Sequence, residues 1–241
     1  MNKSFSITHA LLVAMLLFLT PSFANDIYIT QSGDGLDLDI TQDGANNIIG
    51  TSSTDVTLTG DTMTFAITQT GSSNTIAAII KGDTYTGTWQ FTGDSNTVDL
   101  LCSSSASGNC DTVTLNITTT GDDNTYDFDI GESADADSST VSFTVTGDNN
   151  IINTDVDGQS TALTVTLDNN SSLSTNSSNS DEGVTITTTQ SGNGDSQGMG
   201  ITLGVTGGGG TVDITQSGVN DNIVDLTIAG DDFDVDIIQR G

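Results

Sequence analysis

The sequence predicts an all-β protein, a β-solenoid with two strands per rung and about nine rungs. Polar turns that contain glycine recur along the chain, and the segments between them alternate apolar and polar residues with a period of two. No helical period follows residue 24, and the single proline, Pro21, lies before that point. A lone hairpin cannot bury its inner face, whereas stacked copies form two sheets that enclose a thin core.

The turns define the repeat. From one turn residue to the next the spacing is 22 to 28 residues, after a first step of 11. One turn has Asn169 where the others have glycine, and asparagine tolerates the same left-handed backbone. The turn glycines are Gly33, Gly44, Gly71, Gly93, Gly121, Gly147, Gly192, Gly218 and, at the chain end, Gly241.

Strands are predicted on both sides of the turns. In residues 63–69, for example, the alternation places Met, Phe, Ile and Gln on one face, which is typical of a half-buried strand. Threonine, valine and isoleucine dominate these segments and favour strands. The other clear examples are residues 27–31, 76–80, 126–130, 141–146 and 233–239.

Amide side chains recur at fixed positions on the inward phase. Glutamine lies two residues before a turn glycine and asparagine three residues after it. A buried amide alone is costly, but amides stacked at a constant height hydrogen-bond along the stack. A β-sandwich of hairpins, the alternative fold, gives no reason for this recurrence. The predicted structural ladders are Gln31, Gln42, Gln69, Gln190, Gln216 and Gln239, and Asn47, Asn74, Asn96, Asn124 and Asn150.

The repeated pattern Gln-x-Gly-x-x-Asn resembles the curlin repeat of curli fibre subunits. Residues 69–74 match it fully, residues 42–47 are a second match, and the columns cover most of residues 27–241. The chain departs from the family pattern in the middle rungs, where Phe91, Thr119 and Val145 replace the first glutamine. Apolar residues also replace the family's opening serine and closing glutamine: Met63 and Tyr85 at the first position, Ile80 and Ile130 at the second. The chain therefore resembles a divergent curlin.

That resemblance implies a structural subunit of extracellular amyloid fibres, of the pilus or fimbria type, that serve cell adhesion and biofilm formation. It also implies self-assembly, a nucleator or companion curlin subunit, an outer-membrane secretion apparatus and the cell surface of a Gram-negative bacterium. Whether the chain is a major subunit or a nucleator is left open. The physical mechanism would be head-to-tail stacking, with the last strand, 233–239, and the first, 27–31, as matching unpaired edges.

Charge and composition exclude several other functions. The 241 residues include 32 Asp and Glu but only 3 Lys and Arg, and the formal net charge is −29. Three cations cannot form a basic patch, so nucleic acid and anionic membrane surfaces are excluded as electrostatic partners. With one histidine and no distinctive carboxylate pair, no catalytic site is expected, and no enzyme activity.

Residues 1–24 are predicted to be a secretory signal peptide. Lys3 precedes an apolar run at residues 10–19, and Ser22-Phe23-Ala24 fits the small-residue rule for cleavage after Ala24. The apolar run is too short to span a bilayer, and no later segment qualifies. We therefore expect a secreted single domain at residues 25–241, with no membrane insertion after cleavage.

Two cysteines, Cys102 and Cys110, have seven residues between them in a chain that is expected to be exported. An intramolecular disulfide that closes a loop between rungs is the expected state. Two free thiols or an intermolecular link are the alternatives.

The outward positions form threonine columns before the turns and aspartate columns after them. Each has a structural interpretation, as solvated strand formers and as charges that discourage unwanted edge pairing. The alternative function is a monomeric binding module. In that hypothesis the threonine face binds ice, or the aspartates bind calcium in an adhesin. No cofactor is otherwise expected, and no aspartate stretch matches a known calcium-loop spacing.

Overall fold

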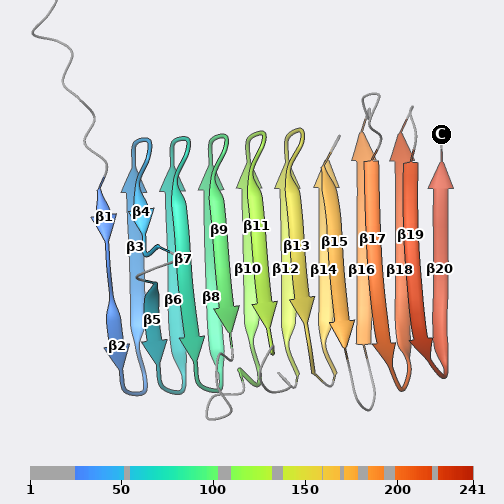
Figure 1. Cartoon of the computed structure of the whole chain (residues 1–241), viewed down its shortest axis with the longest axis horizontal. Helices are drawn as coiled ribbons and strands as arrows, with labels where there is room; N and C mark the ends of the chain where they lie inside the picture. The colour runs from blue at the N-terminus through green and yellow to red at the C-terminus, as the bar shows by residue number, and fades with distance from the viewer. Residues whose placement is uncertain are drawn as a thin grey trace, which may run out of the picture.

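The computed structural model describes residues 25–51, 55–102, 110–131, 138–158, 160–168, 171–178, 184–192, 199–218 and 222–240. Within these residues the chain forms strands and turns only, which confirms the predicted β-solenoid with two strands per rung (Figure 1). With no helix in this part of the chain, none is present that could cross a bilayer. The predicted signal peptide, Asn169 and Gly241 lie outside the described residues.

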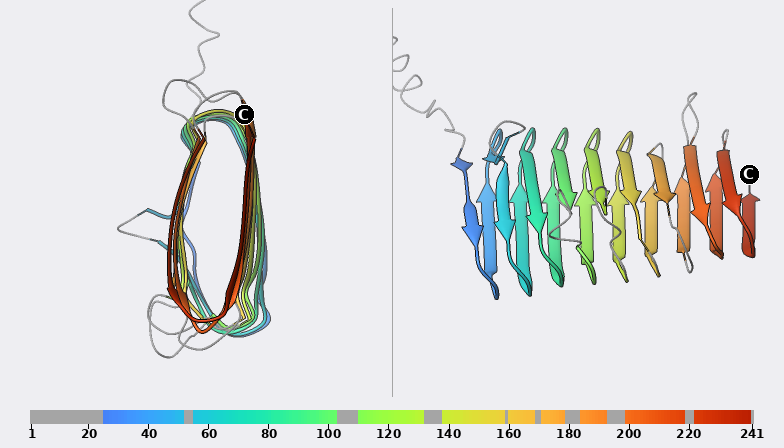
Figure 2. Two further views of the ribbon diagram at one scale, coloured as in Figure 1. Left: turned by 90° about the vertical axis from the view of Figure 1, so that its right-hand side faces the viewer. Right: turned by 60° about the horizontal axis from the view of Figure 1, so that its bottom comes forward.

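Two parallel sheets form the two long walls of the flattened solenoid (Figure 2). The chain passes from one wall to the other and back in each rung, so its strands alternate between the sheets, except that β1 with β2 and β4 with β5 each occupy one wall of a single rung. The first sheet contains β1 (Asp26–Ile27), β2 (Thr30–Ser32), β4 (Ile48–Ile49), β5 (Val56–Thr59), β7 (Thr75–Lys81), β9 (Thr97–Cys102), β11 (Thr125–Ile130), β13 (Ile151–Val156), β15 (Ser172–Ser178), β17 (Met199–Gly207) and β19 (Asn222–Gly230). The second contains β3 (Asp37–Asp43), β6 (Met63–Thr70), β8 (Tyr85–Thr92), β10 (Thr114–Thr120), β12 (Thr140–Thr146), β14 (Ala162–Asp168), β16 (Val184–Gly192), β18 (Gly210–Gly218) and β20 (Phe233–Arg240).

Strand pairing is in register along the whole stack. In the second sheet, Ile67 of β6 lies beside Trp89 of β8, and Trp89 lies beside Ile117 of β10. Inward residues of successive rungs therefore stack on one another, and outward residues form columns on the surface.

The core is thickest in the middle rungs, where aromatic side chains meet between the two sheets. Trp89 is fully buried, with ring centroids 5.6 Å from Phe65 and 6.0 Å from Phe128. Phe128 in turn packs 5.0 Å from Phe143 across the sheets. Towards both ends the inward positions hold smaller aliphatic residues, which are only partly buried in the terminal rungs.

Two insertions account for part of the variation in repeat length. Ile49 pairs with Ile76 and Val56 with Ala78, so six residues of sequence separate Ile49 from Val56 where only Ala77 separates their partners in β7. The five extra residues divide this strand into β4 and β5 without changing the register. At the corner after β9, a disulfide joins Cys102 and Cys110, whose Cα atoms are 5.9 Å apart.

Candidate assembly interface

Turn glycines stack at the corner where the chain passes from the second sheet to the first. Gly44, Gly71, Gly93, Gly121 and Gly147 all have positive φ, from 122° to 142°. A Cβ atom on Gly71 would lie 1.9 Å from the carbonyl oxygen of Gly44, so the stack leaves no space for a side chain. Gly192 and Gly218 end β16 and β18 and face each other at this edge of the second sheet.

Gly33 is a turn glycine with φ 130°, as predicted, but it lies outside this stack. Gln31 lies outside the glutamine column, so its prediction as a member of that ladder is wrong. Gly33 lies at the opposite corner, where a Cβ on Gly60 would be 2.3 Å from the Gly33 carbonyl oxygen. Gln31 belongs to β2 in the first sheet, where it pairs with Leu58 and its amide donates to Gly33 O at 2.9 Å.

Glutamine side chains form direct ladders near both ends of the solenoid. Gln69 Nε2 donates to Gln42 Oε1 at 2.7 Å. At the other end Gln216 Nε2 donates to Gln190 Oε1 at 3.0 Å, and Gln239 Nε2 donates to Gln216 Oε1 at 2.8 Å. Every bond has the same polarity, with the later rung donating to the earlier one. Between the two ladders the same column holds Phe91, Thr119, Val145 and Leu167.

The asparagine column has the predicted amide-to-amide bond at one step, where Asn124 Nδ2 donates to Asn150 Oδ1 at 3.0 Å, but its repeated bond is to backbone. Each asparagine Oδ1 accepts the backbone N–H of the residue at the same position in the preceding rung. These bonds measure 2.8 to 3.0 Å from Asn47 to Asn74, Asn74 to Asn96, Asn96 to Asn124 and Asn124 to Asn150. For Asn47, Asn74 and Asn96, the Nδ2 group also donates to the turn glycine carbonyl of the same rung.

Sequence reasoning missed the two ends of this column. The N–H of Asn25 donates to Asn47 Oδ1 at 3.1 Å, and Asn222 pairs with Met199 at the same height. Each terminal asparagine also joins the terminal glutamine of its own rung. Gln42 Nε2 donates to Asn25 O at 2.8 Å, and Gln239 Nε2 donates to Asn222 O at 3.2 Å. The signal available was the identical spacing: residue 42 is 17 after residue 25, and residue 239 is 17 after residue 222.

Aspartates in the turns form a further ladder that sequence reasoning interpreted only as solvated charge. At the first-to-second sheet corner, Asp34 Oδ1 accepts the N–H of Asp61 at 3.0 Å, and Asp61 Oδ1 accepts that of Asp83 at 2.9 Å. At the other corner, Asp122 Oδ1 accepts the N–H of Asp148 at 2.7 Å. These carboxylates therefore link neighbouring rungs.

The two ends of the solenoid expose unpaired strands. At one end β1, β2 and β3 have a neighbour on one side only, and at the other end so do β19 and β20 (Figure 1). Val235 and Ile237 of β20, which are inward-facing, are 37% and 46% exposed because no further rung covers them. The predicted match between residues 27–31 and 233–239 is wrong, since these segments belong to different sheets. The counterpart of β20 is β3, and that of β19 is β1 with β2.

With these counterparts the two terminal rungs correspond residue for residue. Residues 25–43 and 222–240 both number 19, and they align without an insertion. Asn25 corresponds to Asn222, Gly33 to Gly230 and Gln42 to Gln239.

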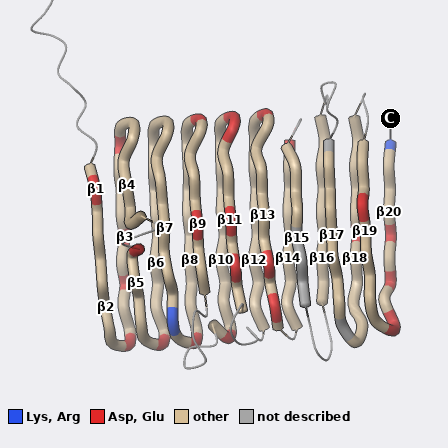
Figure 3. Tube along the Cα trace, in the orientation of Figure 1, with Lys and Arg blue, Asp and Glu red and all other residues tan. Residues whose placement is uncertain are grey.

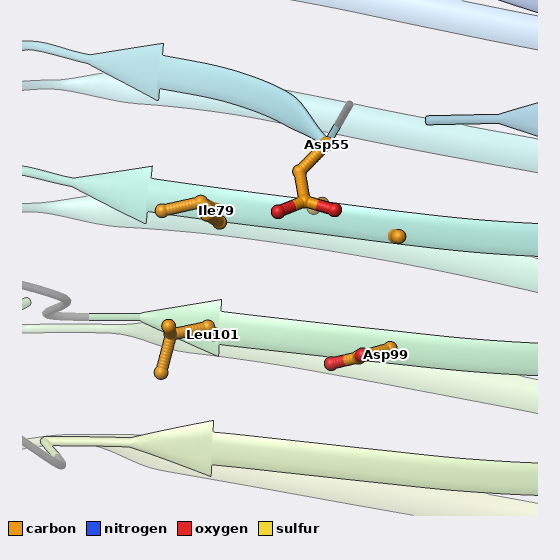
Figure 4. A pocket seen from close by; sticks show the side chains of 6 residues that line it. Asp55, Ile79, Asp99 and Leu101 are labelled. Atoms are coloured by element: carbon orange, nitrogen blue, oxygen red, sulfur yellow. The ribbon is translucent and has the colours of Figure 1, made fainter. Parts of the chain in front are cut away.

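A separate hollow on the outer face of the first sheet is lined by Asp55, Ile79, Asp99 and Leu101, among others (Figure 4). Asp99 pairs with Asp127 of the neighbouring strand. Partial burial, and then the charges of Asp127 and Asp55, raise the pKa of Asp99 above its usual value. No cluster of three or more potential metal-ligating side chains occurs among the described residues.

We expect Asp99→Asn to stabilise the fold at pH 7. A raised pKa means that the folded state holds the proton more tightly, so the charged form opposes folding above that pKa. The gain should be below about 1 kcal/mol, because the carboxylate is largely solvated, and it should vanish as the pH falls through the titration range. Urea unfolding at pH 7 and pH 4 measures it, with Asp26→Asn as the control. A loss of stability at pH 7 would contradict the prediction.

In comparisons with known proteins, the chain matches no family model, no curated protein and no solved structure. The candidate interface therefore depends on the geometry of the two ends.

Proposed function

We propose that this chain is a structural subunit of extracellular curli-like amyloid fibres that form by head-to-tail stacking and serve adhesion and biofilm structure. The observation that carries the proposal is the residue-for-residue correspondence of the two uncovered ends, residues 25–43 and 222–240. An open-ended stack of this kind does not close, so it grows into a filament. Secretion through an outer-membrane apparatus of a Gram-negative bacterium, with a companion curlin subunit, forms part of the proposal through the sequence resemblance.

Stacking continues both sheets from one copy into the next. β20 pairs with β3 of the next copy, and β19 pairs with its β1 and β2. The glutamine ladder then crosses the joint with unchanged polarity, because Gln42 of the next copy donates to Gln239 Oε1. Leu38 and Ile40 of the next copy cover the exposed Val235 and Ile237, which removes apolar surface from water.

The other two ladders also continue across the joint. Asn25 of the next copy places its Oδ1 at the backbone N–H of Asn222, as Asn47 Oδ1 lies at the N–H of Asn25 within the chain. Asp34 of the next copy places its N–H at Asp231 Oδ1, as Asp61 does with Asp34. Three hydrogen-bonded columns therefore define one register, and this register distinguishes the joint from a generic contact between strand edges.

The test is seeded growth of purified residues 25–241, followed by amyloid-dye fluorescence and electron microscopy. We expect fibres with a cross-β spacing of about 4.8 Å. Deleting residues 230–241 should slow elongation by at least about tenfold, because β20 is removed. Unchanged growth of the deletion variant would contradict this joint.

Because a deletion can disturb folding, a charge exchange provides a second test. Arg240 stands opposite Asp43 of the next copy in the aligned joint. Arg240→Asp should slow elongation about threefold, and the double variant Arg240→Asp with Asp43→Arg should restore it. Slow growth of both variants would argue against the proposed register.

A monomeric ice-binding solenoid is a second candidate, favoured by the outer face of the second sheet. Threonines occupy one outward column over most of its strands, interrupted by Gln90 and Ile238, and the neighbouring column over the four strands β6, β8, β10 and β12. The columns contain Thr41, Thr68, Thr118, Thr144, Thr166, Thr189 and Thr215, and Thr70, Thr92, Thr120 and Thr146. A protein that stays monomeric in the growth assay and shows thermal hysteresis would support this candidate over the fibre.

A further inference from the structure

The outer face of the proposed joint contains aspartates where the interior of the stack has uncharged residues. In one outward column of the second sheet, Asp37 and Asp234 stand at the two ends. The residues between them are Thr64, Thr86, Thr114, Thr140, Ala162, Thr185 and Thr211. The next column has Asp39 at one end and Asp213 and Asp236 at the other, with Ala66, Thr88, Asn116, Ser142, Thr164 and Thr187 between them.

Head-to-tail stacking brings these end residues together. Asp234 comes opposite Asp37 of the next copy, and Asp236 comes opposite its Asp39, at the spacing of about 4.8 Å between paired strands. Like charges directly opposite each other destabilise strand pairing. All four side chains are exposed, so their charges also respond to salt.

The remaining charged groups at the joint do not neutralise these pairs. Asp213 of β18 pairs with Asp236 and adds a third carboxylate to that row. Asp231 comes opposite Asp34 in the turn ladder, and Asp225 and Asp26 lie on the other sheet opposite uncharged residues. The cation at the joint is Arg240, which ends β20 and stands opposite Asp43 of the next copy (Figure 3). Lys81 ends β7 in the first sheet, two strands in from β2, whereas the facing pairs lie on the second sheet.

We propose that the head-to-tail joint is gated by charge, with the facing pairs Asp234–Asp37 and Asp236–Asp39 opposing its formation until they are protonated or screened. This inference depends on the proposed function, since it concerns the regulation of the same joint. The subunit stays dispersed at neutral pH and low salt, and acid releases the gate. Inside the chain the equivalent outward positions are uncharged apart from Asp213, which faces Asp236, so the gate opposes joining of copies and leaves most of the folded stack unaffected.

The variant Asp234→Asn with Asp236→Asn tests the gate in seeded elongation assays. At pH 7 and low salt it should elongate about fivefold faster than the wild type. That ratio should approach one in about 1 M salt, where the charges are screened, and it should fall towards one as added acid removes the charges. The variant Asp37→Asn with Asp39→Asn removes the other half of each pair and should give the same acceleration.

The matched control is Asp99→Asn with Asp127→Asn. It removes the same net charge from another facing aspartate pair, but that pair lies within one molecule. Equal acceleration of the control and joint variants would mean that only total charge matters, and it would overturn the gate. Fibres from the wild type, with no acceleration in either joint variant, would overturn the gate and leave the fibre proposal standing. Absence of fibres from every variant at every pH would overturn both.

Discussion

Replacing Gly71 with alanine is expected to lower the free energy of unfolding by about 3 kcal/mol or more. The backbone of Gly71 has φ +122°, a region that other residues rarely adopt. A Cβ atom there would also lie 1.9 Å from the carbonyl oxygen of Gly44 in the rung below. Because this neighbour is backbone, the clash can be relieved only by separating the two rungs. Urea unfolding monitored by circular dichroism measures the loss.

Gly35→Ala is the matched control for this substitution. Gly35 also has positive φ, at +72°, but a Cβ there would meet no atom within 4 Å. The control should therefore show only the cost of the left-handed backbone, about 1 kcal/mol. Equal losses in the two variants would show that the stacking of the turns does not exclude side chains.

Truncating Trp89 to alanine is expected to cost 3 to 5 kcal/mol, roughly the range for large aromatic residues in cores. Its side chain is fully buried and packs against Phe65 and Phe128 of the two sheets. Its indole Nε1 also donates to Phe65 O at 3.1 Å. Removal leaves a cavity that a thin core of two sheets cannot close without moving a strand. Thermal and urea unfolding both measure the effect.

Trp89→Phe separates the cavity from the hydrogen bond. Phenylalanine keeps most of the packing but cannot donate to Phe65 O, so we expect a loss of about 1 to 2 kcal/mol. A loss as large as that of the alanine variant would show that the hydrogen bond dominates, contrary to this prediction.

The fold could be predicted from the sequence because its two signals are local. The alternation in residues such as 63–69 assigns each side chain to a face, and the recurring turns give the rung length. In-register stacking of identical turns then places Gln69 beside Gln42, and the structure has this pair at hydrogen-bond distance.

The assignment of residues to the two corners could not be predicted from motifs alone. The segment around Gly33 has the same Thr-Gln-Ser-Gly sequence as the turns at Gly192 and Gly218. The corner at which Gly33 lies is set by the number of strands before it. Only β1 and β2, which occupy one wall of the first rung, precede Gly33. The short first step of 11 residues was the available evidence that Gly33 and Gly44 lie at different corners.

The hydrogen-bond partners within the columns were also beyond the sequence pattern. A buried asparagine can be satisfied by another side chain or by backbone, and the pattern is the same in both cases. Here the tight turn brings the N–H of Asn74 within 3.0 Å of Asn96 Oδ1, so backbone is the partner. A similar turn geometry brings the N–H of Asp61 to Asp34 Oδ1, although composition alone identifies these residues only as charges.

The concentration of aromatic residues in the middle rungs has a consequence for how the chain folds. Each rung contacts only its neighbours, so the molecule behaves as a linear series of coupled units. Such a series nucleates where local stability is greatest, around Trp89 and Phe128, and propagates outward. The terminal rungs, 25–43 and 222–240, then order last and open most readily. The two exposed ends therefore form only after the rest of the chain has folded. In the proposed fibre, this order would separate the folding of each subunit in time from fibre growth.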